Sequence, residues 1–245
     1  MKETIFGRLC SRLRRFWQPG GRGEEQLSFG SLRRLTPISS SFGYDRGTPI
    51  RRFYIEKFLG EHADDIRGRV LEVGDDQYIR GYGGDKVKHA DVLHVWEDNP
   101  QATIIADLTN ADFIPADSFD CLILTQTLQC IWDIHAAIRT IYRIIKPGGV
   151  VLASLPGITQ VSRYDRERWG DFWRFTRQSA RRLFEETFLP ENVLVEAQGN
   201  VLTAIASLYG LAAEDLRPEE LAYHDPDYEV LIMVRAAKPK LCGEP

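Results

Sequence analysis

The chain has 245 residues, which is long enough for one α/β domain that buries its own core. Hydrophobic residues make up 43% and charged residues 27% of it, as in an ordinary globular protein, and the net charge of −4 argues against a general nucleic-acid binder. The four cysteines are far apart and the five histidines are scattered, so we expect no disulfide framework, no metal site and a reducing, cytoplasmic location. No apolar run approaches the ~20 residues that cross a bilayer, and we expect no signal peptide.

Residues 1–48 differ in composition from the rest of the chain. Over residues 1–17, apolar side chains recur at helical spacing between arginines, which predicts a basic amphipathic helix; they are Ile5, Phe6, Leu9, Leu13, Phe16 and Trp17. Such a helix can lie on an anionic membrane, which would place the protein peripherally at the inner membrane, or it can pack on the domain or form a frayed tail. We favour the second interpretation, with the residues up to 48 as a linker.

We predict a single domain over residues 49–237, followed by a short tail over 238–245. Its strands are expected at 69–73, 91–95, 103–106, 119–124, 150–154, 193–197 and 229–235, and its helices at 49–59, 134–145, 178–188 and 201–211. Asp133 is a suitable N-cap for the second of these helices, and residues 146–149 (Lys-Pro-Gly-Gly) are suitable to end it. The alternation of strands and helices predicts a mostly parallel sheet covered by helices on both faces.

In such sheets, ligands bind beyond the carboxyl ends of the strands. The strand that ends at Gly74 is typical of the opening of a nucleotide-type pocket, but residues 75–78 (Asp-Asp-Gln-Tyr) follow it in place of glycines. The two carboxylates disfavour the pyrophosphate of NAD or FAD, whereas a sulfonium cofactor tolerates them, and Glu72 or Asp75 can favour its positive charges. The alternative is that Asp75 only caps the next turn and nothing binds there.

Four segments, in this order, resemble the class I S-adenosylmethionine-dependent methyltransferases: Val70 to Gly74, Ala106 to Leu108, Ser118 to Leu124 and Arg143 to Val150. The resemblance covers residues 50–236. More narrowly, the chain resembles small bacterial methyltransferase-domain proteins associated with glycan synthesis. It implies a Rossmann-like three-layer α/β sandwich whose seven-stranded, mostly parallel sheet has a reversed final hairpin. It also implies S-adenosylmethionine as the cofactor.

The resemblance assigns roles to individual residues. Glu72 and Gly74 would line the methionine end of the cofactor, Asp107 would meet the adenine amino group, and Leu108 would pack beside the ring. Thr125 and Gln126 would lie beside the cofactor on the loop after the fourth strand. The full set of candidate cofactor-binding residues is Glu72, Gly74, Asp75, Glu97, Asp107, Leu108, Thr125 and Gln126.

The sequence departs from the family pattern in the glycine loop and after the second strand. Asp76 and Tyr78 occupy the second and third glycine positions of the loop. The acidic residue that holds the ribose hydroxyls is Glu97 in one alignment, whereas the other alignment places Trp96 there. The helix that normally follows the second strand is missing from the pattern, because Asn99-Pro100 leads almost directly into the third strand.

The segment after the fifth strand is the expected acceptor side. Trp169 and its aromatic neighbours can form a platform for a sugar ring, and Arg174 or Arg163 can reach a carboxylate or a phosphate. Asp165 and His135 are candidate general bases by position. The alternative is that these aromatic residues only close the core and that the histidine is structural.

Together these patterns favour a cytoplasmic methyltransferase that acts on a small-molecule or glycan acceptor at a hydroxyl group. The rival hypothesis is a catalytically silent domain of the same fold that serves as a partner or scaffold in glycan assembly. We expect no nucleic-acid substrate, because the domain is acidic and no Asn-Pro-Pro-Tyr-like motif follows the fourth strand. The sequence carries no signal for the oligomeric state.

Overall fold

The computed structural model describes residues 30–240. The chain divides into two compact units, residues 1–36 and residues 37–245. The described part of the first unit holds one 3₁₀ turn, Gly30–Leu32. The helix predicted over residues 1–17, with its membrane contact, lies outside the described residues, as do residues 241–245 of the predicted tail.

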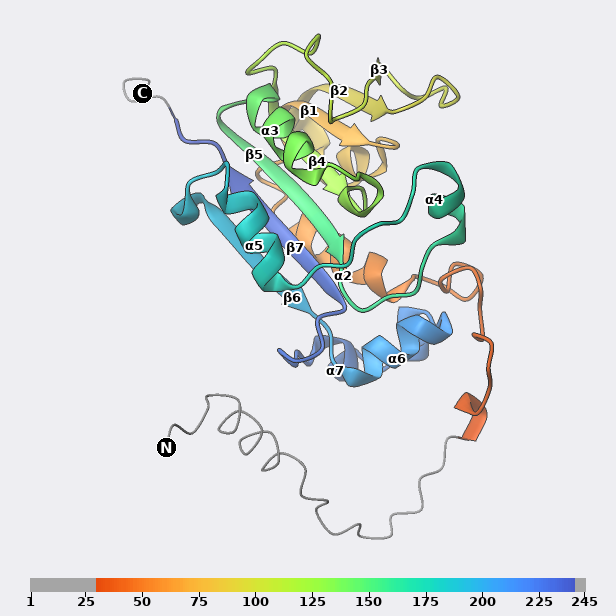
Figure 1. Ribbon diagram of the computed structural model, residues 1–245. Coiled ribbons are helices and arrows are strands. Elements are labelled where there is room, and N and C mark those ends of the chain that lie inside the picture. The colour runs from red at the N-terminus through yellow and green to blue at the C-terminus, as the bar shows by residue number, and fades with distance from the viewer. Residues whose placement is uncertain (1–29, 241–245) are drawn as a thin grey trace, which may run out of the picture. The chain divides into compact units, whose positions relative to one another are not determined.

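The second unit is built on a seven-stranded sheet with the strand order β3-β2-β1-β4-β5-β7-β6 (Figure 1). Strands β1 to β5 run parallel, whereas β7 is antiparallel to both β5 and β6. This arrangement confirms the predicted fold class, a mostly parallel sheet with a reversed final hairpin. The strands are β1 (Gly68–Val73), β2 (Val87–His94), β3 (Ile104–Ile105), β4 (Phe119–Thr125), β5 (Ile145–Pro156), β6 (Val193–Gln198) and β7 (Leu231–Ala237).

Helices cover both faces of the sheet and give it a buried core on each side. They are α2 (Ile50–Glu61), α3 (Ile134–Ile144), α4 (Arg163–Arg168), α5 (Arg177–Glu185), α6 (Val201–Tyr209) and α7 (Pro218–Ala222). Because side chains alternate across a strand, Leu122 and Leu124 of β4 join the core beneath α3 and α5, while Cys121 and Ile123 join the core beneath α2. The result is a three-layer sandwich (Figure 1).

The short helical turns lie between these elements. A five-residue π-helix, Ile79–Gly83, and a 3₁₀ turn, Gly84–Lys86, connect β1 to β2. The other 3₁₀ turns of the second unit are Leu128–Cys130, Pro190–Asn192 and Ala213–Asp215. Residues 95–103 contain no helix, in agreement with the missing pattern after the second strand.

The start of β5 differs from the prediction. Helix α3 ends at Ile144, and β5 begins at the next residue rather than at residue 150. The register with β4 jumps from Phe119–Ile145 to Cys121–Val150, so residues 146–149 form a bulge inside the strand. Backbone pairing holds this bulge, since Gly148 N donates to Lys238 O at 2.8 Å and Lys238 N donates to Gly149 O at 2.9 Å. Because Lys238 is distant in sequence from residues 146–149, the local sequence pattern does not show this pairing.

Candidate active site

Two cavities open where the parallel strands end. The first, here called the β1–β4 cavity, has a volume of about 650 Å³ and lies over the loops that follow β1, β2, β3 and β4. The second, here called the α2 cavity, has about 470 Å³ and lies between the start of α2 and the loops after β4 and β5. Thr125, Gln126 and Asp165 line both cavities, so these three residues form a wall that the two spaces share.

Gly74 lies at the edge of the β1–β4 cavity in a conformation that suits glycine. Its φ is +99°, and a Cβ atom added there would meet no atom within 4 Å. Its N–H donates to Leu93 O at 3.0 Å, and Asn99 Nδ2 donates to its carbonyl oxygen at 2.6 Å. Asn99 therefore fixes the turn, a role that sequence reasoning missed because it treated this residue only as a breaker of the next helix.

Glu72 stabilises the loop instead of lining the cavity. Its side chain is 1% exposed, and its carboxylate accepts the backbone N–H groups of Tyr78 at 3.1 Å and Ile79 at 2.8 Å. Burial raises the pKa of Glu72 to about 8, although these two N–H groups favour the charged form. The carboxylate thus orders a loop that lacks the family's second and third glycines.

The two loop carboxylates also make local contacts. Asp75 Oδ1 accepts the backbone N–H of Gln77 at 3.0 Å, as the capping alternative expects, and Asp76 forms a 2.7 Å ion pair with Arg80. Neither Asp75 nor Asp76 lines either cavity. Of residues 74–78, therefore, Gly74 lines the β1–β4 cavity.

The far end of the β1–β4 cavity is lined by Asp107, Leu108 and Trp96. Oδ1 of Asp107 accepts two hydrogen bonds of 2.8 Å, from the N–H and the hydroxyl of Thr109. These bonds orient the carboxylate, and Leu108 adds a buried apolar surface beside it. Of the two candidates at this position, Trp96 lines the cavity and Glu97 does not.

Trp169 covers the β1–β4 cavity from the segment after β5. Its ring lies 6.0 Å from that of His94, 6.1 Å from that of Trp96 and 5.7 Å from that of Tyr164, measured between centroids. Its buried Nε1–H has no hydrogen-bond partner among residues 30–240. A buried donor without a partner is costly to the fold, which makes it a candidate contact for a bound molecule.

Asp165 lies between the two cavities at the start of α4. The Ser162 hydroxyl caps this helix by accepting the backbone N–H of Asp165 at 3.2 Å, which holds the residue in the first turn. Within the part of the chain that the structure describes, the Asp165 carboxylate makes no hydrogen bond or ion pair. It is therefore free to accept a proton from a molecule in either cavity.

Gln126 forms the wall between the cavities in a strained conformation. Its φ is +47°, which is uncommon for a residue other than glycine, and its N–H donates to Ser154 O at 3.0 Å. Strained backbone of this kind clusters at functional sites. The neighbouring Thr125 completes the wall.

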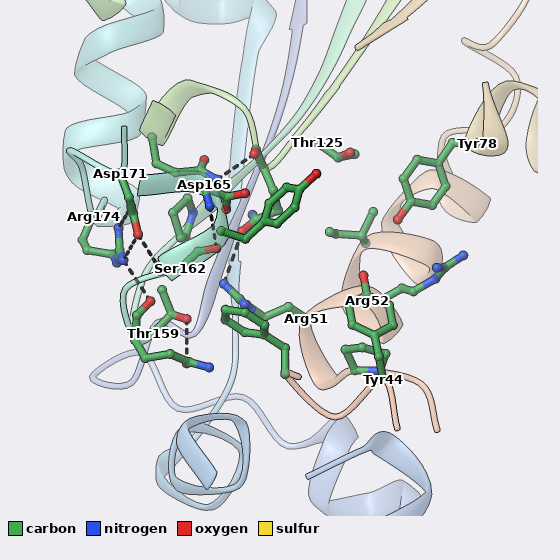
Figure 2. Close-up of a pocket in the computed structure, with 18 residues that line it drawn as sticks. Tyr44, Arg51, Arg52, Tyr78, Thr125, Thr159, Ser162, Asp165, Asp171 and Arg174 are labelled. Atoms are coloured by element: carbon green, nitrogen blue, oxygen red, sulfur yellow. Dashed lines mark hydrogen bonds and ion pairs between the residues drawn. The ribbon is translucent and has the colours of Figure 1, made fainter. Parts of the chain in front are cut away.

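The α2 cavity is lined by three arginines, which Figure 2 shows together with the acidic side chains beside them. Arg174 donates to both carboxylate oxygens of Asp171, with one distance of 2.9 Å, so its charge is compensated. Arg52 forms a 2.7 Å ion pair with Glu56. Sequence reasoning did not single out Arg51, the third arginine, because nothing in a helix pattern shows that its side chain enters a cavity.

Several predicted residues lie elsewhere. His135 forms a 2.7 Å contact with Glu186 on the exposed surface, and neither it nor Arg163 lines either cavity. Trp173 Nε1 donates to Ile131 O at 2.9 Å, a structural contact. Phe172, expected to close the core, is instead 47% exposed and lines the β1–β4 cavity.

Residues 30–240 contain no group of three histidine, cysteine, aspartate or glutamate side chains that could hold a metal ion. In the same range, no helix is long and apolar enough to cross a membrane.

Comparisons with known proteins agree with this geometry. A family model described as a methyltransferase domain matches residues 79–153, which begins just after the loop that lacks the glycines. A SAM-dependent methyltransferase from Archaeoglobus fulgidus superimposes with a TM-score of 0.52 at 11% identity, over 76% of this chain and 94% of that one. The chain has the fold of the S-adenosylmethionine-dependent methyltransferases. No match was found among curated proteins.

Two further solved structures share this methyltransferase fold. The CurJ carbon methyltransferase has a TM-score of 0.54 at 11% identity, over 82% of this chain and 58% of that one. The [4+2]-cyclase SpnF has a TM-score of 0.53 at 16% identity, over 80% and 85%. The methyltransferase fold and the family match imply S-adenosylmethionine as the cofactor.

The residues of the β1–β4 cavity fit this cofactor. A volume of about 650 Å³ is in the range of small-molecule sites. Gly74 leaves open space beside the backbone, Asp107 offers an acceptor for an amino group, and Leu108 offers an apolar surface for a ring. The unpartnered Trp169 Nε1–H would gain an acceptor. In the proposal that follows, the β1–β4 cavity is called the cofactor cavity and the α2 cavity is called the acceptor cavity.

Proposed function

We propose that this protein is an S-adenosylmethionine-dependent methyltransferase that methylates a hydroxyl group of a small or saccharide-like acceptor. The observation that supports the proposal best is that Thr125, Gln126 and Asp165 line both cavities. A molecule in each cavity would have its reacting end at this common wall. The association with glycan synthesis rests on the resemblance of the sequence and the cytoplasmic location on its widely spaced cysteines, and both belong to the proposal.

The bound cofactor would supply an electrophilic methyl group. The chain would contribute mainly alignment, since holding two reactants in line can lower the barrier by several kcal/mol of the roughly 7–11 kcal/mol that positioning offers. Gln126 and Thr125 set the distance between the two cavities, and Trp169 covers the cofactor side against water. Asp165 would accept the proton of the acceptor hydroxyl, because it lines both cavities and its carboxylate has no hydrogen-bond or ion-pair partner among residues 30–240.

Calorimetry with S-adenosylhomocysteine tests the cofactor part of this proposal. We expect saturable heat at micromolar to millimolar ligand, because Gly74 leaves open space beside the backbone and Asp107 lines the cavity as a hydrogen-bond acceptor. Absence of heat at millimolar ligand would sink the proposal and favour the rival, a catalytically silent domain that serves as a scaffold or partner in glycan assembly.

Turnover is tested with labelled methyl donor and a panel of hydroxyl acceptors. Asp165→Asn should bind S-adenosylhomocysteine normally and lose about 10²- to 10⁴-fold in turnover, the usual contribution of a general base. His135→Gln is the matched control and should keep wild-type turnover, because this side chain lies on the surface away from both cavities. Unchanged turnover in Asp165→Asn would remove Asp165 as the base.

A further inference from the structure

Arg51 is the arginine of the acceptor cavity that forms no ion pair with a carboxylate among residues 30–240, although Asp165 and Asp171 lie in the same cavity. Among residues 30–240 no carboxylate lies within ion-pair distance of it, and its nearest polar contact is Gln126 Oε1 at 3.4 Å. Its guanidinium lies 5.0 Å from the centre of the Phe42 ring. Burial, together with the neighbouring Arg174, lowers the pKa of Arg51 to about 10, so the side chain stays charged at pH 7. A partly buried guanidinium that pairs with no carboxylate among the described residues gives up hydration without gaining an ion pair, which points to a role in binding.

The direction of the side chains supports this interpretation. Figure 2 shows Arg51 reaching into the acceptor cavity below Ser162 and Asp165, while Arg52 points away from Arg51, toward the side of the cavity where Tyr78 lies. Arg174 lies at the opposite edge and is held by Asp171. Of the three arginines in this cavity, Arg51 alone is left without a carboxylate in the described part of the chain.

Gln129 provides a second, independent feature of the same cavity. Its side chain is 5% exposed, and its Nε2 donates to Gln126 O at 2.6 Å. Its buried Oε1 has no hydrogen-bond donor among the described residues. An acceptor atom buried in this way is satisfied when a bound molecule brings a hydroxyl group to it.

The charges around Arg51 select the kind of anion. Asp165 and Asp171 both line the acceptor cavity, and they oppose a second negative charge there. The charges of Arg52 and Arg174 are already balanced by Glu56 and Asp171. The planar guanidinium of Arg51, which pairs with no carboxylate among residues 30–240, matches one planar carboxylate in a bidentate pair, whereas a phosphate dianion would leave excess negative charge.

We propose that the acceptor is a hydroxy acid, whose carboxylate binds Arg51 and one of whose hydroxyl groups donates to Gln129 Oε1. This inference rests on the proposed methyltransferase function, because only that function makes the bound hydroxy acid a methyl acceptor. The binding itself can be measured without turnover. Sugar acids and small hydroxycarboxylic acids are the members of this class that a cavity of about 470 Å³ admits.

Thermal unfolding of the full-length protein with matched pairs of probes tests the inference. The pairs are glucuronate with glucuronamide and glycolate with glycolamide, and glucose 6-phosphate is added as the phosphorylated probe. At about ten times its Kd, a hydroxy acid should raise the Tm by roughly 2–4 °C, and its amide should not. Equal effects of acid and amide in both pairs overturn the inference, as does a larger effect of the phosphate.

Variants on the same helix sharpen the test. Arg51→Gln should lose the difference between acid and amide, whereas Arg52→Gln should keep it, because Glu56 already neutralises that charge. Arg51→Lys retains the charge without the planar fork and should keep a smaller difference, which covers the case that Arg51→Gln does not fold. Preference for the acid that survives in folded Arg51→Gln overturns the assignment of Arg51.

S-adenosylhomocysteine binding is measured on the same samples. A wild-type protein that binds S-adenosylhomocysteine but does not distinguish acid from amide contradicts only the hydroxy-acid inference. A protein that distinguishes them and binds no S-adenosylhomocysteine contradicts only the methyltransferase proposal. The two failures are thus separated.

Discussion

Gly74 shows at the scale of one residue how the cofactor cavity depends on backbone conformation. Its φ of +99° places it where L side chains rarely lie, while the space beside its Cα is open. Gly74→Ala should therefore cost about 1–2 kcal/mol of unfolding free energy through strain. It should also weaken S-adenosylhomocysteine binding, because the added methyl group enters the cavity. Urea unfolding and calorimetry measure the two effects.

Gly81→Ala is the matched control for this change. A Cβ at Gly81 also meets no atom within 4 Å, but its φ lies outside the strained region and it lines neither cavity. We expect its stability and its affinity for S-adenosylhomocysteine to stay near those of the wild type. Equal losses in both variants would contradict the role given to Gly74.

The loop between β1 and the π-helix shows how one buried carboxylate can organise an element. Glu72 binds the N–H groups of Tyr78 and Ile79, and its pKa is raised from an ordinary 4.5 to about 8. Because the folded state holds the proton more tightly than the unfolded state, the contribution of Glu72 to stability falls as pH rises from about 4.5 to about 8. Glu72→Gln removes this titration.

We therefore expect the difference in unfolding free energy between the wild type and Glu72→Gln to depend on pH. The advantage of the wild type should be largest near pH 5 and smaller at pH 8. Near pH 5 the variant should be less stable by about 1–3 kcal/mol, since the amide group cannot accept both N–H groups. Urea unfolding at several pH values measures the difference. A difference that does not change between pH 5 and pH 8 would show that Glu72 titrates outside this range.

At the same scale, the sequence predicts elements better than it predicts contacts. Apolar patterns placed all seven strands and the helices beneath which the cores form, because burial of one face leaves a periodic signal. The pattern did not show that β5 begins at Ile145, since its bulge is held by pairing with Lys238. Arg51 was missed for the same reason: its contact with Gln126 joins residues 75 positions apart.

Among the residues that were predicted for the site, some lie at strand ends and others in connecting loops. Gly74, Asp107 and Gln126 follow strands, and the carboxyl ends of parallel strands meet at one edge, so their positions in the cavity follow from the fold. In the connections, whose path depends on packing, Asp165 and Trp169 line a cavity, whereas Glu97 and Arg163 do not. For a loop residue, therefore, the sequence indicates which strand end it lies near but not whether its side chain enters a cavity.

At the scale of the whole molecule, both cavities belong to the second unit. Their lining residues run from Phe42 to Arg174, all within residues 37–245. The segment 37–48 is tied to this unit, since Ile38 N donates to Tyr209 O at 2.8 Å and Arg46 forms a 2.6 Å ion pair with Asp215. The unit therefore includes residues ahead of position 49, where the sequence suggested that the domain begins.

Two truncations test this boundary. A protein that lacks residues 1–36 should bind S-adenosylhomocysteine with wild-type affinity and unfold in one cooperative step, because it keeps the sheet and both cavities. A protein that lacks residues 1–48 should have a Tm lower by several degrees, since it loses the Arg46–Asp215 ion pair and the hydrogen bonds of Thr48 with Glu214. It should also lose the distinction between hydroxy acid and amide, because Phe42 and Tyr44 close one side of the acceptor cavity. Equal Tm values and equal probe responses in the two truncations would instead place the boundary at residue 49.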